Sequence, residues 1–210
     1  MIPAFGLAIA YLAGSVPSAY LAGRLMKGID LRTVGSGNLG ATNVYRSLGF
    51  KAALVVFLLD FAKGALPVYY LPRLLGAMRA GSDEFIWWSL AYAAMAILGH
   101  AKPIFLLWKG GGKGVATGAG VFFALATGPM LSALAVFGFV LWASGYVSLG
   151  SLMGSVVLPI FVFLDQGTTP VFYSSVAIAA FVFSRHRENI QRLRNGTEHR
   201  FNRRKMEETE

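Results

Sequence analysis

The chain has 210 residues, of which 55% are hydrophobic and only 14% are charged, and its mean hydropathy is +0.57. This composition is too apolar for a soluble domain of this length, so we expect an integral membrane protein. The net charge of +9 comes from dispersed cations and not from a base-reading motif, which argues against nucleic acid as a partner and favours anionic lipids or substrates. The absence of cysteine excludes disulfides, thiolate catalysis and thiolate metal sites.

Apolar stretches bounded by charges or by Gly, Pro and Ser predict an all-α fold with seven transmembrane helices. They cover residues 2–22, 52–71, 85–98, 115–127, 130–147, 152–164 and 171–184. The third, fourth, sixth and seventh are shorter than the roughly 20 residues that cross a bilayer upright, so they must borrow flanking residues or end inside it. We expect a single seven-helix transmembrane domain over residues 1–184 and a polar cytoplasmic tail over residues 185–210, with the last motif at its start.

The positive charges orient the predicted helices. With seven crossings, all but two of the 19 Lys and Arg fall in segments that share a side with the carboxyl tail. The two exceptions are Arg73 and Arg79. The positive-inside rule therefore predicts the N-terminus outside and the C-terminus in the cytoplasm. It also places both glycine-rich loops described next on the cytoplasmic side.

The first glycine-rich loop, residues 34–43, reads VGSGNLGATN. Its glycines allow successive N–H groups to converge on an anion, and Ser36 adds a small hydroxyl donor. Arg46 can supply a planar fork that matches two phosphate oxygens. A flexible turn between helices is the alternative, but polar side chains this dense beside lipid need partners.

The second glycine-rich loop, residues 109–114, reads KGGGKG. It is not a nucleotide-binding P-loop, because Leu107 stands where that motif has glycine and Lys113 is followed by glycine instead of Ser or Thr. A glycine run that enters a helix at Val115 still presents free N–H groups and a positive dipole end beside Lys113. The sequence therefore predicts an anion site, with a hinge whose lysine reaches the headgroups as the alternative.

Five other polar positions stand out in or beside apolar stretches. Asp60 and Lys63 lie one turn apart on the second predicted helix, where both a structural ion pair and a catalytic role are open. His186 and Asn189 share a face if the last helix continues beyond its apolar part. For His100, just before the second loop, we expect a structural hydrogen bond.

Together these motifs resemble the bacterial acyl-phosphate-dependent glycerol-3-phosphate acyltransferase family. The resemblance rests on residues 35–46, 60–64, 99–117 and 186–198, in this order along essentially the whole chain. It implies a multi-pass enzyme of the bacterial cytoplasmic (inner) membrane whose active site faces the cytoplasm. It also implies transfer of a fatty acyl group from acyl phosphate to the 1-hydroxyl of glycerol 3-phosphate. The products are lysophosphatidic acid and phosphate, in the first acylation step of phospholipid biosynthesis.

The resemblance also implies roles for individual residues. The expected catalytic residues are Ser36, Lys113, His186 and Asn189. The expected substrate-binding residues are Arg46, Ser36, Gly37, Asn38, Gly110, Gly111, Gly112, Gly114 and Ser151. Asp60, Lys63 and Glu198 are expected to be structural or to line the cavity. We expect Arg46 and Lys113 to neutralise phosphate charge, and either His186 or a substrate phosphate to accept the proton.

The expected partners are glycerol 3-phosphate, fatty acyl phosphate and membrane lipids, with no nucleic acid. No cofactor or metal is expected, because the 3 histidines are scattered and no carboxylate cluster accompanies them. A transporter or channel for a phosphorylated solute is the alternative function. It is disfavoured because both glycine loops lie on one predicted face and no inverted repeat is visible.

Overall fold

The computed structural model describes residues 2–76 and 79–201, and every regular element within these ranges is a helix. The elements are α1 (Ile2–Ser15), α2 (Ser18–Lys27), α3 (Ala41–Leu48), α4 (Phe50–Gly76), α5 (Asp83–Ala101), the 3-10 helix η1 (Ile104–Leu106), α6 (Val115–Leu125), α7 (Thr127–Ser144), α8 (Val147–Gln166), α9 (Pro170–Arg185) and α10 (Arg187–Arg194). Their contacts divide the chain into two compact units, unit 1 (Met1–Leu125) and unit 2 (Ala126–Glu210). Each unit is described by itself.

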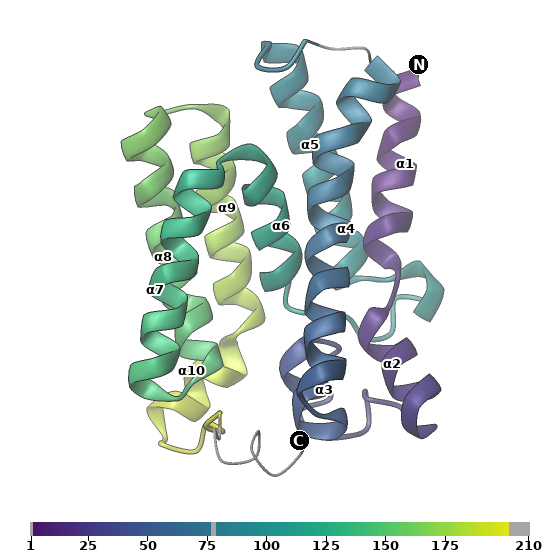
Figure 1. Cartoon of the computed structure of the whole chain (residues 1–210), viewed down its shortest axis with the longest axis vertical. Helices are drawn as coiled ribbons and strands as arrows, with labels where there is room; N and C mark the ends of the chain where they lie inside the picture. The colour runs from purple at the N-terminus through teal and green to yellow at the C-terminus, as the bar shows by residue number, and fades with distance from the viewer. Residues whose placement is uncertain (1, 77–78, 202–210) are drawn as a thin grey trace. The chain divides into compact units, whose positions relative to one another are not determined.

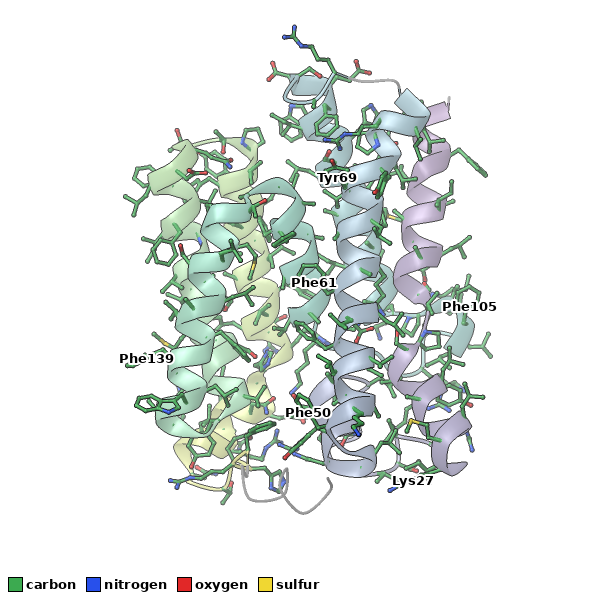
Figure 2. All side chains as sticks on the ribbon, viewed as in Figure 1. Lys27, Phe50, Phe61, Tyr69, Phe105 and Phe139 are labelled. Atoms are coloured by element: carbon green, nitrogen blue, oxygen red, sulfur yellow. The ribbon has the colours of Figure 1, made fainter. Side chains whose placement is uncertain are left out.

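The helices are apolar enough for a membrane protein. Five segments are long and hydrophobic enough to cross a bilayer: Pro3–Lys27, Phe50–Gly76, Asp83–Leu106, Thr127–Ser144 and Val147–Gln166. Two shorter apolar helices, Val115–Leu125 and Pro170–Arg185, accompany them. A helix satisfies its own backbone hydrogen bonds, as hydrocarbon requires. Side chains such as Phe105 and Phe139 project outward and are exposed, as befits lipid-facing positions (Figure 2).

Two helix boundaries differ from the sequence-based expectation. The first apolar stretch is not one helix: α1 ends at Ser15 and α2 begins at Ser18, because Pro17 has no N–H and pushes Val16 out of the helical region. The fourth and fifth predicted helices separate at Ala126 and not at the Gly-Pro pair that follows it. Pro129 instead lies in the first turn of α7, where its missing N–H is not needed.

Unit 1 is a bundle in which α1, α4 and α5 lie side by side and α6 packs on α4 (Figure 1). Glycines allow the closest approaches. A Cβ on Gly64 of α4 would lie 2.1 Å from the carbonyl oxygen of Thr117 on α6, and a Cβ on Gly14 of α1 would lie 2.1 Å from that of Ala96 on α5. Helix pairs in lipid associate through such small residues, because lipid tails are as apolar as the helices themselves. The contact between Gly64 and Thr117 holds the start of α6, directly after the second glycine loop, against α4.

Unit 2 places α7, α8 and α9 side by side, with α10 near one end (Figure 1). The chain beyond α10 folds back onto this end: the N–H of Thr197 donates to the Arg192 carbonyl at 2.9 Å, and the N–H of Phe201 donates to the Gly145 carbonyl at 2.7 Å. The first part of the predicted tail is therefore packed structure. Residues 202–210 lie outside the described part of the chain.

Candidate functional site

The first glycine loop, between α2 and α3, is closed by the buried side chain of Asn43. Its Nδ2 donates to the carbonyls of Leu31 at 3.1 Å and Val34 at 3.0 Å, while its Oδ1 accepts from the N–H of Ser36 at 3.1 Å. Gly35 has φ +62°, and a Cβ there would lie 2.3 Å from Asn43 Oδ1. The Ser36 N–H is thus used within the loop. The hydroxyl, which is the group expected as a donor, belongs to a side chain that is exposed.

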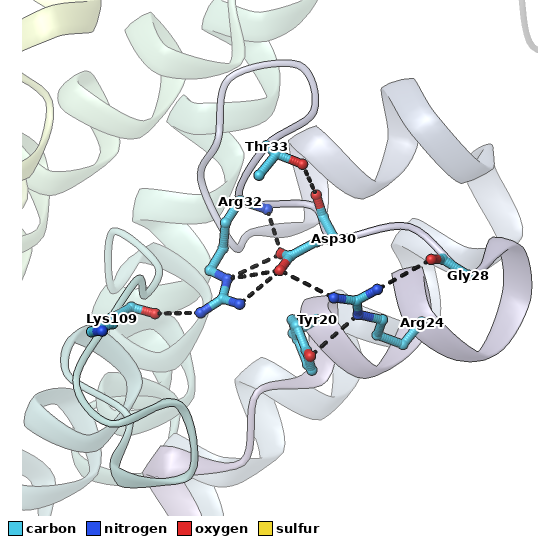
Figure 3. Close-up of polar contacts among 7 residues, drawn as sticks. All are labelled: Tyr20, Arg24, Gly28, Asp30, Arg32, Thr33 and Lys109. Carbon is cyan, nitrogen blue, oxygen red and sulfur yellow. Dashed lines mark hydrogen bonds and ion pairs between the residues drawn. The ribbon is translucent and has the colours of Figure 1, made fainter.

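An arginine cluster connects the two glycine loops within unit 1 (Figure 3). Arg32 grips Asp30 with two nitrogens, Nε to Oδ1 at 3.0 Å and Nη2 to Oδ2 at 2.6 Å, and its Nη1 donates to the carbonyl of Lys109 at 3.2 Å. Arg24 reaches the same carboxylate at 3.4 Å. The hydrogen bond from Arg32 is the main reason that the pKa of Asp30 falls from 3.8 to about 2. Asp30 is therefore negatively charged, and Arg32 links its carboxylate to the backbone of the second loop at Lys109.

The second glycine loop consists of glycines because there is no room for side chains. A Cβ on Gly111 would lie 2.2 Å from the carbonyl oxygen of Ala101, and one on Gly112 would lie 1.9 Å from His100 Nε2. Gly110 has φ +93°, in the left-handed region that favours glycine. The Gly112 N–H donates to the His100 carbonyl at 3.1 Å, so this group is not one of the free donors that the sequence suggested.

The remaining donors of this loop belong to the helix start. As predicted, α6 begins at Val115, directly after the glycine run. The first N–H groups of a helix have no partner within it and carry its positive dipole end. Lys113 is partly buried immediately before them. This combination is able to hold an anion.

A strained turn leads into the second loop. Leu107 and Trp108 have φ values of 50° and 58°, which are uncommon for residues other than glycine. The turn is held because Trp108 Nε1 donates to the Tyr11 hydroxyl at 2.9 Å, and that hydroxyl donates to the Lys102 carbonyl at 2.9 Å. Sequence analysis did not single out Tyr11, and its position in an apolar helix gave no signal.

The other predicted residues of unit 1 lie on or behind these loops. Asn38 lies in the first loop near Gly40, where a Cβ would meet Asn38 Nδ2 at 2.8 Å, and Gly37 has φ +67°. Arg46 is exposed on α3, directly after the first loop. Because Arg32 ties this loop to Lys109, unit 1 brings the first predicted anion-binding segment together with the second.

Unit 2 holds a polar network centred on the buried carboxylate of Glu198. Its Oε1 accepts from Asn189 Nδ2 at 2.8 Å and from the Ser148 hydroxyl at 3.1 Å, and its Oε2 accepts from Arg192 Nε at 2.8 Å. Burial alone would raise the pKa of Glu198, but the hydrogen bonds from Arg192, Asn189 and Ser148 outweigh it and lower that pKa. Glu198 therefore fixes the orientation of Asn189. Sequence analysis missed Ser148 and Arg192 as its partners.

His186 stands at the junction of two helices. The last apolar helix does not simply continue, because α9 ends at Arg185 and α10 begins at Arg187. His186 Nδ1 lies 2.8 Å from the Val182 carbonyl oxygen. Since a carbonyl only accepts, Nδ1 carries the proton, and in the neutral ring Nε2 is left as an acceptor. The contact with the Val182 carbonyl thus fixes the orientation of the imidazole.

The turn between α7 and α8 carries the last predicted residue. Ser151 is buried on α8, and its hydroxyl donates to the carbonyl of Val147 at 2.9 Å. At the turn itself, Arg200 Nε donates to the Tyr146 hydroxyl at 3.1 Å, and its side chain covers Gly145. The tail thereby supplies a cation at this turn. Among residues 2–76 and 79–201, no group of three or more His, Asp or Glu is placed to hold a metal ion.

Known sequences and structures identify the fold and its family. The family model for glycerol-3-phosphate acyltransferase matches residues 4–196. A glycerol-3-phosphate acyltransferase of Synechococcus sp. (strain CC9902) is 46% identical over 194 residues, 92% of each chain. One of Endomicrobium trichonymphae is 45% identical over 185 residues, 88% of each chain, and one of Syntrophotalea carbinolica is 42% identical over 197 residues, 93% of this chain and 95% of that one.

Two solved structures share the fold. The crystal structure of PlsY (YgiH), an integral membrane glycerol 3-phosphate acyltransferase, in its glycerol 3-phosphate form superposes with a TM-score of 0.85 at 38% identity, covering 95% of this chain and 96% of that one. The lysophosphatidic acid form of the same protein gives a TM-score of 0.80 at 38% identity, covering 95% of both chains. The chain is therefore an integral membrane protein that belongs to the glycerol-3-phosphate acyltransferase family.

Proposed function

We propose that this acyltransferase takes its fatty acyl group from acyl phosphate and transfers it to the 1-hydroxyl of glycerol 3-phosphate. The observation that carries the proposal is the pair of glycine-rich loops in unit 1, tied by Arg32 and flanked by Arg46 and Lys113. Two anionic substrates need such cations and backbone donors. The glycerol 3-phosphate and lysophosphatidic acid forms of the related PlsY structure support this acceptor and this product.

For this reaction the protein must hold and orient two anions. The hydroxyl oxygen of glycerol 3-phosphate attacks the acyl carbon, and the bond between that carbon and the bridging phosphate oxygen breaks with its electron pair leaving on phosphate. Acyl phosphate is already an activated mixed anhydride, so orientation and stabilisation of developing negative charge supply the catalysis. In our proposal Arg46, Lys113 and the first N–H groups of α6 meet phosphate oxygens. Neither a cofactor nor a metal enters the reaction.

For the hydroxyl and its proton, we propose the residues that the family resemblance implies. His186 is proposed to take the hydroxyl proton, since an imidazole nitrogen can act as a general base and its ring is fixed through Nδ1. A phosphate oxygen of the substrates is the alternative acceptor. Asn189, which is held by Glu198, and Ser36 are proposed to orient oxygens of the substrates. If His186→Ala retains most of its turnover at saturating substrates, the proton goes to phosphate.

The membrane setting follows from the helices and the charge distribution. We propose seven transmembrane helices in the bacterial inner membrane, with the N-terminus outside and both glycine loops facing the cytoplasm. The five long and two shorter apolar helices and the placement of the cations support this topology. Lipid would hold the acyl chain by about 0.8 kcal/mol per buried methylene, while glycerol 3-phosphate enters from water.

Purified protein in detergent tests the proposal directly. Glycerol 3-phosphate is supplied with either palmitoyl phosphate or palmitoyl-CoA, and lysophosphatidic acid and released phosphate are followed. We expect product from palmitoyl phosphate alone, and we expect Lys113→Ala to abolish it. Product from palmitoyl-CoA instead would refute the donor assignment. Activity without a sealed compartment also separates an acyltransferase from the transporter alternative, which the family relationship already disfavours.

A further inference from the structure

A buried ionic cluster lies behind the second glycine loop of unit 1. Asp60 Oδ1 and Lys63 Nζ on α4 are 2.8 Å apart, and their side chains are 3% and 8% exposed. His100 Nδ1, near the end of α5, lies 3.8 Å from the same carboxylate oxygen, with its side chain 5% exposed. Charges at this depth in a membrane helix are costly, which makes them candidates for a function.

Lys63 holds the carboxylate of Asp60 in place, and Lys63 itself contacts the backbone where α1 and α2 separate. Lys63 Nζ donates to the carbonyl of Val16 at 3.0 Å as well as meeting Asp60. That carbonyl is accessible because Pro17 ends the regular hydrogen bonding of α1. The position of Asp60 therefore depends on Lys63, and that of Lys63 depends on a fixed backbone oxygen.

His100 connects the cluster to the loop by two contacts. Its carbonyl accepts from the Gly112 N–H at 3.1 Å. Its ring lies so close to the loop that a Cβ on Gly112 would come 1.9 Å from Nε2. Gly111 is packed in the same way, since a Cβ there would lie 2.2 Å from the Ala101 carbonyl oxygen. A change in the position of the imidazole must therefore displace the backbone of the glycine loop.

We propose that Asp60, held by Lys63, positions His100 and through it the backbone of Gly111 and Gly112, and that this sets the affinity of the second loop for the phosphate of the acyl donor. In this proposal the three side chains are positioning residues, because they act through the backbone of the loop. The inference rests on the proposed function. An ion pair that only pins α4 in the bundle is the competing explanation.

Two variants separate positioning from a purely structural role. Asp60→Asn with Lys63→Met removes both charges, so no buried charge is left unpaired and folding is expected to be retained. If the pair is only structural, this double variant keeps the wild-type KM for palmitoyl phosphate. His100→Asn keeps an amide facing Asp60 but removes the ring edge that lies against Gly112. Ser89→Ala is the matched control, since Ser89 is also buried on α5 but contacts the carbonyl of Val68, away from the loop.

Steady-state kinetics in detergent give the readout, together with thermal unfolding of each variant. For both variants we expect the KM for palmitoyl phosphate to rise about tenfold, a factor typical of lost support behind a binding group. The KM for glycerol 3-phosphate and the unfolding midpoint should stay close to wild type. Inhibition by inorganic phosphate should weaken in parallel. The control should match wild type in all four measurements.

The outcomes distinguish the inference from the function on which it rests. A double variant with a wild-type KM for palmitoyl phosphate overturns the inference alone, and so does an equal rise in both KM values. Wild-type protein that makes no product from palmitoyl phosphate overturns the proposed donor and the inference together. If the double variant does not fold, His100→Asn decides by the same criterion.

Discussion

The two units of the molecule build their candidate functional groups in different ways. In unit 1 backbone N–H groups and side chains lie on or beside two loops, and the second loop is shaped by lack of space: Gly111 and Gly112 pack against the end of α5 with no room for a side chain. In unit 2 the groups are side chains on helices, and one buried carboxylate, Glu198, orients them. Steric changes should therefore damage unit 1 most, and changes of charge should damage unit 2 most.

Among changes that leave the proposed phosphate-binding cations in place, the largest effect is expected from a methyl group in the second glycine loop. In Gly111→Ala the new Cβ meets a backbone carbonyl oxygen at 2.2 Å, which cannot move aside as a flexible side chain does. We expect kcat/KM for acyl transfer to fall about 100-fold, since displacement of a binding backbone by about 1 Å costs that much. Gly138→Ala on α7 is the control, because a Cβ there meets nothing within 4 Å. Retention of more than about a tenth of activity by Gly111→Ala would show that the loop adapts.

A charge change in unit 2 should produce the next largest effect. Glu198→Gln leaves Arg192 and Asn189 without their shared anionic acceptor. We expect a loss of about 2 kcal/mol in the free energy of unfolding, typical for hydrogen bonds to a charged group, and a matching fall in turnover. Thermal unfolding and initial rates measure both.

The control for this change is the neighbouring carboxylate. Glu188 lies 3.8 Å from the same arginine but its side chain is 86% exposed, so Glu188→Gln should leave stability and rate unchanged. Equal behaviour of the two variants would mean that burial of Glu198 has no consequence.

A smaller effect is expected from cutting the link between the two loops. Arg32→Ala removes the hydrogen bond to the Lys109 carbonyl, worth about 1 kcal/mol, and should raise the KM for palmitoyl phosphate about fivefold. Arg24→Ala is matched to it, because Arg24 also contacts Asp30 but makes its other hydrogen bonds to the Tyr20 hydroxyl and the Gly28 carbonyl. If both variants raise the KM equally, the link to Lys109 is not what matters.

The smallest effect should be a change in stability that depends on pH. Because the pKa of Asp30 is lowered from 3.8 to about 2, its carboxylate stabilises the folded protein above its ordinary pKa, and this contribution is lost as the pH falls towards 2. Asp30→Asn should therefore unfold at a lower temperature than wild type at pH 7, and the difference should vanish on acidification over that window. A difference that is constant with pH would exclude the ion pair as its origin.

Much of the fold could be predicted from the sequence, because the length of each apolar stretch determines whether it forms a membrane helix. The apolar stretches predict the helices of the membrane protein, and the glycine run before Val115 predicts the start of α6 correctly. Helix ends were less accurate: Pro17 breaks the first stretch, whereas Pro129 lies harmlessly in a first turn. A proline in an apolar stretch predicts a helix break, but whether the helix breaks depends on where in the helix the proline lies.

By itself, the sequence determined the class of the protein, its helical stretches and the residue types suited to anion binding, because composition and motif spacing are local properties. Only the tertiary structure decided which polar groups are already used. Asn43 takes the N–H of Ser36, His100 takes that of Gly112, and Glu198 takes the amide of Asn189. Such pairings join a helix to the loop beside it, and the physical reason that they form is burial, which makes an unpaired polar group costly.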